Sequence, residues 1–262
     1  MRKVVLACLL GLSAATVSAA DAPATVQTIE ACIRANLPGD LQVRSFEMVA
    51  TDKTGGTRTL GGRVYARIED NQLAAMMRVE APSDMRGAAY LAREGKEGKE
   101  EEMYVYIPAL QKVRRITGGM KESSLFGTDL SYSDLKQITY AFSGGKMQLE
   151  KTEDFEARPA WIVTMKPESG TEVSRFDLVR AWIDQKSCML MKAEFSQDKM
   201  VRKRFTSSPK FLAQDGKRWY ITEGRMEDVQ EKTSTTVKIT GLSSGSELAD
   251  RLFNPRMFYL GN

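Results

Sequence analysis

Histidine is absent from the 262 residues of this sequence, and its absence removes whole classes of chemistry. Histidine is the commonest metal ligand and the side chain best suited to proton transfer near neutral pH. Ser-His-Asp and Cys-His catalytic arrangements therefore cannot be built. Cysteine is scarce as well, because Cys8, Cys32 and Cys188 are too far apart to supply the paired thiolates of a zinc cluster. We expect no metal and no cofactor.

Other signatures of catalysis are missing too. The sequence has no phosphate loop, dinucleotide-binding fingerprint or calcium loop. The S-x-x-K spacing of penicillin-binding enzymes occurs four times, but the K-T-G at Lys53 to Gly55 precedes all four, which is the wrong order. Carboxylate pairs such as Asp129 with Asp134 have spacings no different from those of surface acids. These absences favour a binding protein over an enzyme, with a hydrolase built on an unrecognised carboxylate or Ser-Lys pair as the alternative.

Long apolar runs are few, and the run at the N-terminus is short. Val4 to Leu12 is about half of the roughly 20 apolar residues that a membrane span needs. Arg2 and Lys3 precede it, and small residues around Ala19 follow, as in a secretory signal peptide. We therefore predict a signal peptide at residues 1–20, and a mature chain, residues 21–262, that is exported to the periplasm of a Gram-negative host.

Charge and cysteine content bound the mature chain further. Of 38 Lys and Arg, two belong to the leader, so the remainder nearly balances the 34 acids and gives no reason to expect nucleic acid as a partner. In an oxidising compartment, Cys32 and Cys188 are candidates for a disulfide that closes a long loop and stabilises the fold by about 4 to 5 kcal/mol. The alternative is two buried thiols that never meet.

The apolar pattern predicts a mainly β (α+β) domain. Val26, Ile29, Ile33 and Leu37 recur at helical spacing before Pro38-Gly39, which indicates one amphipathic helix at the start. From Val43 onward, short β-favouring segments alternate with turn signals about every 10 to 15 residues, which is typical of antiparallel hairpins. A single large antiparallel sheet that curls over its own helices is one way to bury its apolar face, and a β-sandwich is the alternative.

A central stretch, Met103 to Leu135, stands apart from this pattern because it mixes arginines, glycines, exposed-looking apolar residues and carboxylates. It resembles the signature of the bacterial outer-membrane lipoprotein-sorting family, the relatives of the periplasmic carrier LolA. "AWID" from Ala181 and "MLMKAEF" from Met189 are similar to a later hairpin of that family. The matching pieces of the central stretch are Tyr104-x-Tyr106-x-Pro108, Lys112-x-Arg114-Arg115-Ile116, Ser124-Leu125-Phe126-Gly127-Thr128-Asp129 and Ser131-Tyr132-x-Asp134-Leu135.

The resemblance implies a curled antiparallel half-barrel with an N-terminal helix and with helices or loops as a lid over an apolar cavity. It also implies a carrier that shuttles the acyl chains of a lipoprotein or lipid toward the outer membrane. An inner-membrane lipid-exporting transporter and an outer-membrane acceptor are the partners expected for such a carrier. A periplasmic sensor of mislocalised lipoprotein on the same scaffold is the alternative.

Candidate ligand-binding residues are the large apolar and aromatic side chains of the predicted strands and of the central stretch. They are Met76, Tyr104, Tyr106, Ile116, Leu125, Phe126, Leu130, Tyr132, Trp161 and Trp182.

The central stretch also suggests a lid. Gly118-Gly119 is a candidate hinge for a segment whose Leu125 and Phe126 plug the mouth of the half-barrel. Arg114 and Arg115 are consecutive on a predicted strand, so their side chains point to opposite faces. One of them is expected to face inward and to latch the segment by pairing with Asp129 or Asp134. The alternative is two exposed arginines beside a loop that packs as ordinary core.

Overall fold

The structure is a computed structural model that describes residues 24–39, 41–95, 101–134, 145–167, 175–244 and 250–260. The predicted signal peptide at residues 1–20 lies outside these residues. Within them the chain is mainly β, as predicted, and is built around one large antiparallel sheet. None of the helices in the described ranges has the length and apolar content to cross a bilayer.

Helix α1 (Val26–Arg34) begins at a reciprocal cap. The Thr28 amide donates to Oγ1 of Thr25 at 3.2 Å, and the Thr25 amide donates to Oγ1 of Thr28 at 2.9 Å. These bonds satisfy donors that a helix start otherwise leaves unpaired. Ile29 and Ile33 are buried, which agrees with the helical spacing of the sequence.

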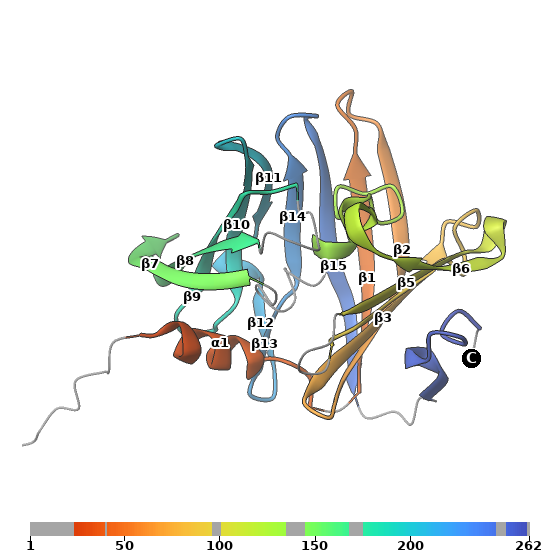
Figure 1. Ribbon diagram of the computed structural model, residues 1–262, viewed down its shortest axis with the longest axis horizontal. Coiled ribbons are helices and arrows are strands. Elements are labelled where there is room, and N and C mark those ends of the chain that lie inside the picture. Colours follow the sequence, from red (N-terminus) through yellow and green to blue (C-terminus); the bar gives the residue numbers. More distant parts are fainter. Residues whose placement is uncertain are drawn as a thin grey trace, which may run out of the picture.

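The main sheet contains thirteen strands in the order β6-β5-β4-β3-β2-β1-β15-β14-β11-β10-β9-β8-β7 (Figure 1). Every neighbouring pair is antiparallel, so the prediction of hairpins rather than parallel units is confirmed. The strands are β1 (Gln42–Thr51), β2 (Thr57–Glu69), β3 (Gln72–Ala81), β4 (Ala89–Arg93), β5 (Glu102–Ile107), β6 (Lys112–Ile116), β7 (Gly145–Phe155), β8 (Arg158–Pro167), β9 (Leu178–Asp184), β10 (Leu190–Gln197), β11 (Met200–Thr206), β14 (Glu223–Asp228) and β15 (Thr233–Ser244).

Smaller elements complete the described chain. β12 (Leu212–Asp215) and β13 (Arg218–Ile221) form a separate two-stranded hairpin, which lies near α1 at the lower side of Figure 1. The short 3-10 helices are η1 (Pro108–Leu110), η2 (Gly118–Glu122), η3 (Pro209–Phe211) and η4 (Asp250–Phe253).

Strands β1 and β15 join the two halves of the chain at the centre of the sheet. Their register runs from Gln42 opposite Ser244 to Thr51 opposite Ser234, with an irregularity between Ser45 and Phe46. Strands β2 to β6 follow on one side of this pair and β14 and β11 to β7 on the other. The first and last long strands therefore hold the two hairpin series in one sheet.

The two faces of the sheet bury different apolar clusters. On β3, Met77 and Val79 belong to the main core, whereas Ala74 and Met76 pack in a second cluster with Phe253 and Phe258 of the C-terminal segment. Side chains alternate between faces along a strand, so these clusters lie on opposite sides of the sheet. The main core also contains Ile29 and Ile33, which places α1 on its side.

Candidate functional site

A largely apolar cavity of about 200 Å³ lies on the main-core face of the sheet. Its walls come from the central strands, from α1 and the residues after it, and from the β12–β13 hairpin. The apolar lining includes Ile33, Leu37, Phe46, Met48, Val64, Ala66, Leu73, Ala75, Met77, Tyr90, Ala92, Leu130, Leu190, Phe205, Ile221, Val237 and Ile239.

A row of alanines explains why space remains here. Ala66 lies opposite Ala75, and Ala75 lies opposite Ala92, so three adjacent strands present a methyl group at the same level. All three residues line the cavity and are only partly buried. Neighbouring positions on the same face hold Val64, Met77 and larger side chains that fill the core. The cavity is therefore a consequence of side-chain size at matched register positions.

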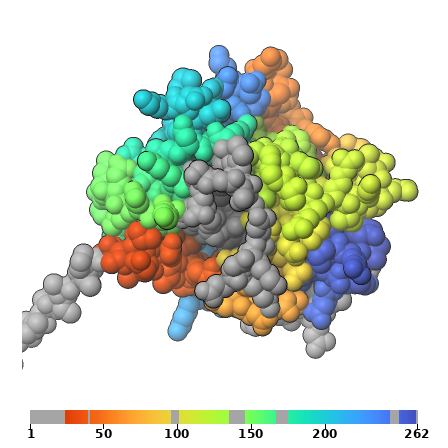
Figure 2. Space-filling view, viewed as in Figure 1, coloured from red at the N-terminus to blue at the C-terminus, as the bar shows by residue number. Residues whose placement is uncertain are grey.

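The central stretch packs over this face as a strap, a name we use for residues Thr117–Asp134. Leu125 and Leu130 are buried in the main core, and Leu130 reaches the cavity wall. Tyr90 of β4 donates its hydroxyl to the Tyr132 carbonyl at 2.9 Å. Figure 2 shows the strap in yellow-green and α1 in red on the same viewed side of the molecule.

The tight turn inside the strap has a local cause. Phe126 and Gly127 both adopt positive φ, 53° and 80°, and the Leu125 amide donates to the Leu130 carbonyl at 2.7 Å. A non-glycine residue at positive φ is strained and persists only when its surroundings hold it. Burial of the Phe126 ring in the main core supplies that stabilisation.

The strap is held by the carboxylates that the sequence singled out, but their partners differ from the prediction. Asp134 accepts a bond from Nζ of Lys203 on β11 at 2.6 Å, and the two side chains are 1% and 4% exposed. Asp129 accepts from Thr235 on β15 at 2.7 Å and from the hydroxyl of Thr233. The strap is therefore fixed to two strands on either side of β14.

The predicted latch through Arg114 and Arg115 is wrong. Both arginines are exposed on β6, the strand at one edge of the sheet. An ion pair with an exposed guanidinium contributes little free energy to folding. A buried carboxylate, in contrast, is costly unless a buried partner compensates its charge. Lys203 meets this need because it projects from a central strand toward the strap. The charged residues of an edge strand also discourage pairing with a second sheet.

Glu122, at the start of the strap, shares the environment of Asp134. Its Oε1 accepts a bond from the Ser133 hydroxyl at 2.8 Å, while Oε2 lies 3.9 Å from Nε of Arg175. Burial, followed by the charge of Asp134, raises the pKa of Glu122 above its ordinary value. Oε2 of Glu122 and Oδ1 of Asp134 are buried without a hydrogen-bond partner among the described residues.

This environment makes a prediction about pH. The pKa of Glu122 is higher in the folded state than in the unfolded chain, so between these two pKa values the folded protein binds a proton that the unfolded chain has lost. The free energy of unfolding should therefore fall as pH rises through the folded-state pKa. Glu122→Gln should therefore be more stable than the parent protein at about pH 8 and should lose this advantage near about pH 4. Urea unfolding at both pH values measures the difference, with Glu47→Gln on the exposed side of β1 as the control. A difference that does not change with pH would contradict the prediction.

The structure divides the ten predicted ligand-binding residues between the two faces. Leu130 and Met76 contribute to the cavity wall, although the Met76 side chain belongs to the cluster on the opposite face. Trp161 is partly buried against the main core. Four others lie within the main core without lining the cavity; these are Ile116, Leu125, Phe126 and Tyr132.

Three predicted residues lie on the wrong face. Tyr104 and Tyr106 pack against the second cluster, where Tyr106 stacks on Tyr259 with ring centroids 4.4 Å apart. Trp182 packs with Ala160 and Ile162 in a third small cluster. The neighbours of each along its strand belong to the main core. Because successive side chains of a strand point to opposite faces of the sheet, these three residues lie on the face opposite to the main core. Aromatic content alone does not tell which face of a strand is the inner one.

Sequence reasoning missed the residues that make the cavity. The alanine row leaves no signal in a single sequence, because its members come together only through strand register. Phe46 and Met48 on β1 were overlooked although they alternate with polar residues, a pattern that marks an inward face. Trp219 was missed because its hairpin reads as a surface turn.

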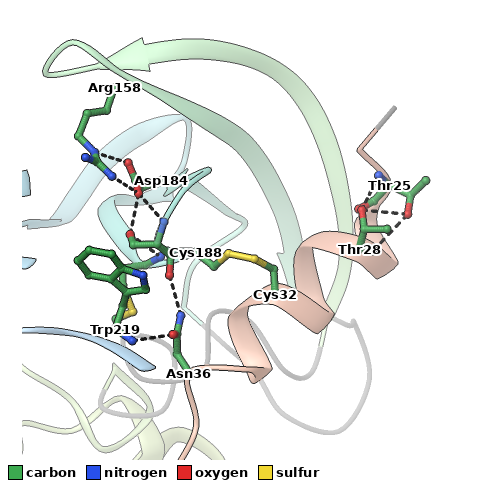
Figure 3. The surroundings of a disulfide bond; sticks show 10 residues. Thr25, Thr28, Cys32, Asn36, Arg158, Asp184, Cys188 and Trp219 are labelled. Carbon is green, nitrogen blue, oxygen red and sulfur yellow. Dashed lines mark hydrogen bonds and ion pairs between the residues drawn. A yellow bond between two sulfur atoms is a disulfide. The ribbon is translucent and has the colours of Figure 1, made fainter. Parts of the chain in front are cut away.

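A disulfide joins Cys32 of α1 to Cys188, which lies between β9 and β10 (Figure 3). Cys188 is buried and lines the cavity. Asn36 reinforces the same corner, since it donates to the Ser187 carbonyl at 2.7 Å and accepts from the Trp219 amide at 2.8 Å. Helix α1 is therefore tied both to one wing of the sheet and to the β12–β13 hairpin.

The lining of the cavity is chemically suited to an apolar ligand. Among the described residues no group of three or more Cys, Asp or Glu side chains is placed to hold a metal ion. Asp129 and Asp134 hold the strap in place through Thr235 and Lys203, and the cavity wall is dominated by methyl, methylene and aromatic groups. Such a surface favours a ligand with an extended apolar part.

Comparison with known proteins supports a family assignment. Comparison with curated proteins returns no match. A crystal structure of a DUF1329 family protein from Desulfovibrio piger has a TM-score of 0.77 at 20% identity and covers 86% of this chain and 94% of its own. A putative outer membrane lipoprotein-sorting protein domain from Vibrio parahaemolyticus has the same TM-score and identity, over 88% of this chain and 97% of its own.

A LolA superfamily protein from Nitrosomonas europaea has a TM-score of 0.67 at 15% identity, over 88% of this chain and 98% of its own. At these identities the likeness shows the fold alone. A family model described as an uncharacterized protein matches residues 71–259, which is more than half of the chain. The chain therefore belongs to the family that this model describes, and its fold is that of the DUF1329 and LolA-superfamily lipoprotein-sorting domains.

Proposed function

We propose that the protein is a periplasmic carrier that holds the acyl chains of a lipid or lipoprotein in the apolar cavity and moves them toward the outer membrane. The observation that carries the proposal is a cavity kept open by the alanine row in a core that is otherwise filled by large side chains. A core that served stability alone would gain free energy by filling such a space. The space is therefore expected to receive a ligand.

The energetics of acyl-chain transfer suit this site. Exposing a 16-carbon chain to water costs roughly 12 kcal/mol, at about 0.8 kcal/mol per methylene. A carrier without an energy source must offset this cost by burying the chain in an apolar space prepared for it. The lining residues of β1 also extend far enough for such a chain, because Gln42 to Met48 spans about 20 Å at about 3.3 Å per residue. One acyl chain spans roughly 15 Å, half of the bilayer hydrocarbon core.

The architecture that this function requires is a curled half-barrel with α1 and the strap as its lid. We assign residues 21–262 to one LolA-like domain that follows a signal peptide at residues 1–20, and we expect the protein to have no enzymatic activity. The description of the Vibrio neighbour as a putative lipoprotein-sorting domain supports the same function. An inner-membrane lipid-exporting transporter and an outer-membrane acceptor are the partners that a carrier needs.

Lipid analysis of the native protein tests the proposal directly. Protein purified from its own host without detergent is expected to carry acyl lipid or acylated peptide, which mass spectrometry of an organic extract identifies. The delipidated protein should then bind a fluorescent fatty acid such as cis-parinaric acid. A cavity that is empty when isolated and that also rejects this probe would rule out the carrier.

A cavity-filling substitution links the binding to this site. Ala75→Phe places a ring in the middle of the alanine row and is expected to weaken cis-parinaric acid binding by at least about tenfold, or about 1.4 kcal/mol, because the ring occupies the space that the ligand needs. Fluorescence titration measures the affinity, and circular dichroism checks the fold. Thr59→Phe, on an exposed position of β2, is the matched control and should bind normally. Equal affinity for the two variants would place the ligand elsewhere.

A further inference from the structure

The polar residues of the cavity wall gather at one end. Asn36 follows α1, Gln42 and Arg44 begin β1, and Glu94 follows β4. Trp219 of the β12–β13 hairpin completes this group, because its amide donates to Asn36. Glu101, before β5, lines the same wall.

The strap closes the opposite end. The Asp129 amide donates to Oγ1 of Thr235 at 2.9 Å, and Thr235 pairs with Ala50 near the end of β1. Gln42, at the other terminus of β1, donates its side-chain amide to Asp215 of the β12–β13 hairpin at 3.2 Å. The anchor of the strap and the polar end are therefore separated by most of the length of β1. Figure 1 shows β12–β13 and α1 at the lower side and the yellow-green strap above them.

Trp219 has the properties of a residue at the boundary between the apolar interior and water. Its side chain lines the cavity, and its indole N–H makes no hydrogen bond within the part of the chain that the structure describes. Tryptophan is favoured where an apolar body meets a wet surface. Nearby, Nε of Arg44 donates to Gln42 at 2.8 Å, and its guanidinium lies 5.4 Å from the ring centre of Tyr220. Hydrogen-bond donors, the guanidinium of Arg44 and the carboxylates of Glu94 and Glu101 thus meet the apolar interior at this end.

We propose that the ligand is an amphiphile whose head rests against Trp219 and Arg44 at the polar end of the cavity and whose tail points toward the strap. The head presents oxygen atoms that accept hydrogen bonds. The carboxylate of a fatty acid has such oxygens, and so does the ester or phosphate of a lipid. This inference rests on the proposed function and adds the orientation of the ligand and the residues that meet its head.

Quenching by spin-labelled stearate tests the orientation. The double variant Trp161→Phe/Trp182→Phe leaves Trp219 as the tryptophan that reports emission. Stearate with a nitroxide at its fifth carbon should quench Trp219 at least about twofold more than stearate labelled at its sixteenth carbon, at equal occupancy, because the indole lies at the polar end. The immobilised fraction of the electron spin resonance spectrum gives the occupancy of each ligand independently of the quenching. Both substituted tryptophans lie outside the cavity lining, so the double variant should keep the binding site.

The outcomes separate the two proposals. Stronger quenching from the fifth carbon supports the orientation, and equal or stronger quenching from the sixteenth carbon overturns it while leaving the carrier function intact. If neither stearate is immobilised, the carrier function fails and the orientation fails with it.

Removing the charge tests the head contact. Arg44→Met is expected to weaken binding of stearate and of lysophosphatidylglycerol by about tenfold each, because a charge-assisted hydrogen bond to the head is lost. The head that binds more tightly to the parent protein identifies the preferred chemistry. Binding of N-phenyl-1-naphthylamine, which has no acidic head, should not weaken. Arg63→Met, on a half-exposed arginine of β2, is the control. If Arg44→Met binds both amphiphiles with unchanged affinity, the head of the ligand does not lie at this end of the cavity.

Discussion

Replacement of Lys203 by methionine is expected to lower the free energy of unfolding by about 3 to 5 kcal/mol, since it leaves a buried carboxylate without its partner. Asp134 is 1% exposed and receives the lysine ammonium at 2.6 Å, and Glu122 adds a second buried carboxyl whose ionisation Asp134 opposes. Methionine keeps much of the lysine stem, so the effect reports the lost charge. Urea unfolding at neutral pH measures the change.

Arg204, the next residue on β11, offers a matched control. Its side chain is 36% exposed and pairs with Glu194 at 3.3 Å, so Arg204→Met should cost less than about 1 kcal/mol. The double variant Lys203→Met/Asp134→Asn should recover part of the loss, because the unpaired charge is gone. If Lys203→Met and Arg204→Met are equally stable, the buried pair does not hold the strap.

Removing the disulfide should have an effect of similar size. Cys32 and Cys188 are separated by 156 positions, and closing a loop of that length stabilises the folded state by about 5 kcal/mol in the chain-entropy account. The double variant Cys32→Ala/Cys188→Ala should therefore unfold at a clearly lower urea concentration than the oxidised parent protein. In protein prepared without residues 1–20, which contain Cys8, a single disulfide between these residues should also leave no free thiol.

Reduction supplies the control for the disulfide. The parent protein treated with dithiothreitol should approach the stability of the double alanine variant, and dithiothreitol should have no effect on that variant. Two titratable thiols in the oxidised protein, or equal unfolding midpoints for parent and variant, would show that the cysteines are not bridged in solution.

The prediction of α1 and of the hairpins succeeded because both rest on local patterns. Ile29 and Ile33 are spaced for one helix face, and the strands are separated by turn residues such as Asp70-Asn71 and Asp198-Lys199, which adopt the positive φ that tight turns require. Local patterns are visible in one sequence because the residues that make them are neighbours in the chain.

The candidate site was harder to predict, and the latch shows why. Asp134 was correctly singled out, but Lys203 is 69 residues away in the sequence and nothing local connects the two. The two arginines chosen instead are close in sequence, and both are exposed on a strand at the edge of the sheet. Closeness along the chain was a poor guide to which side chains become buried together.

The sequence by itself determined the class of this protein: a mainly β chain without histidine chemistry, with one amphipathic helix and a central stretch that resembles lipoprotein-sorting proteins. Only the tertiary structure decided which face of each strand is internal, where the alanine row leaves a cavity, and that Lys203 holds the strap. The physical reason is strand register. A shift of one residue exchanges the two faces of a strand, and register is set by pairing between strands distant in sequence.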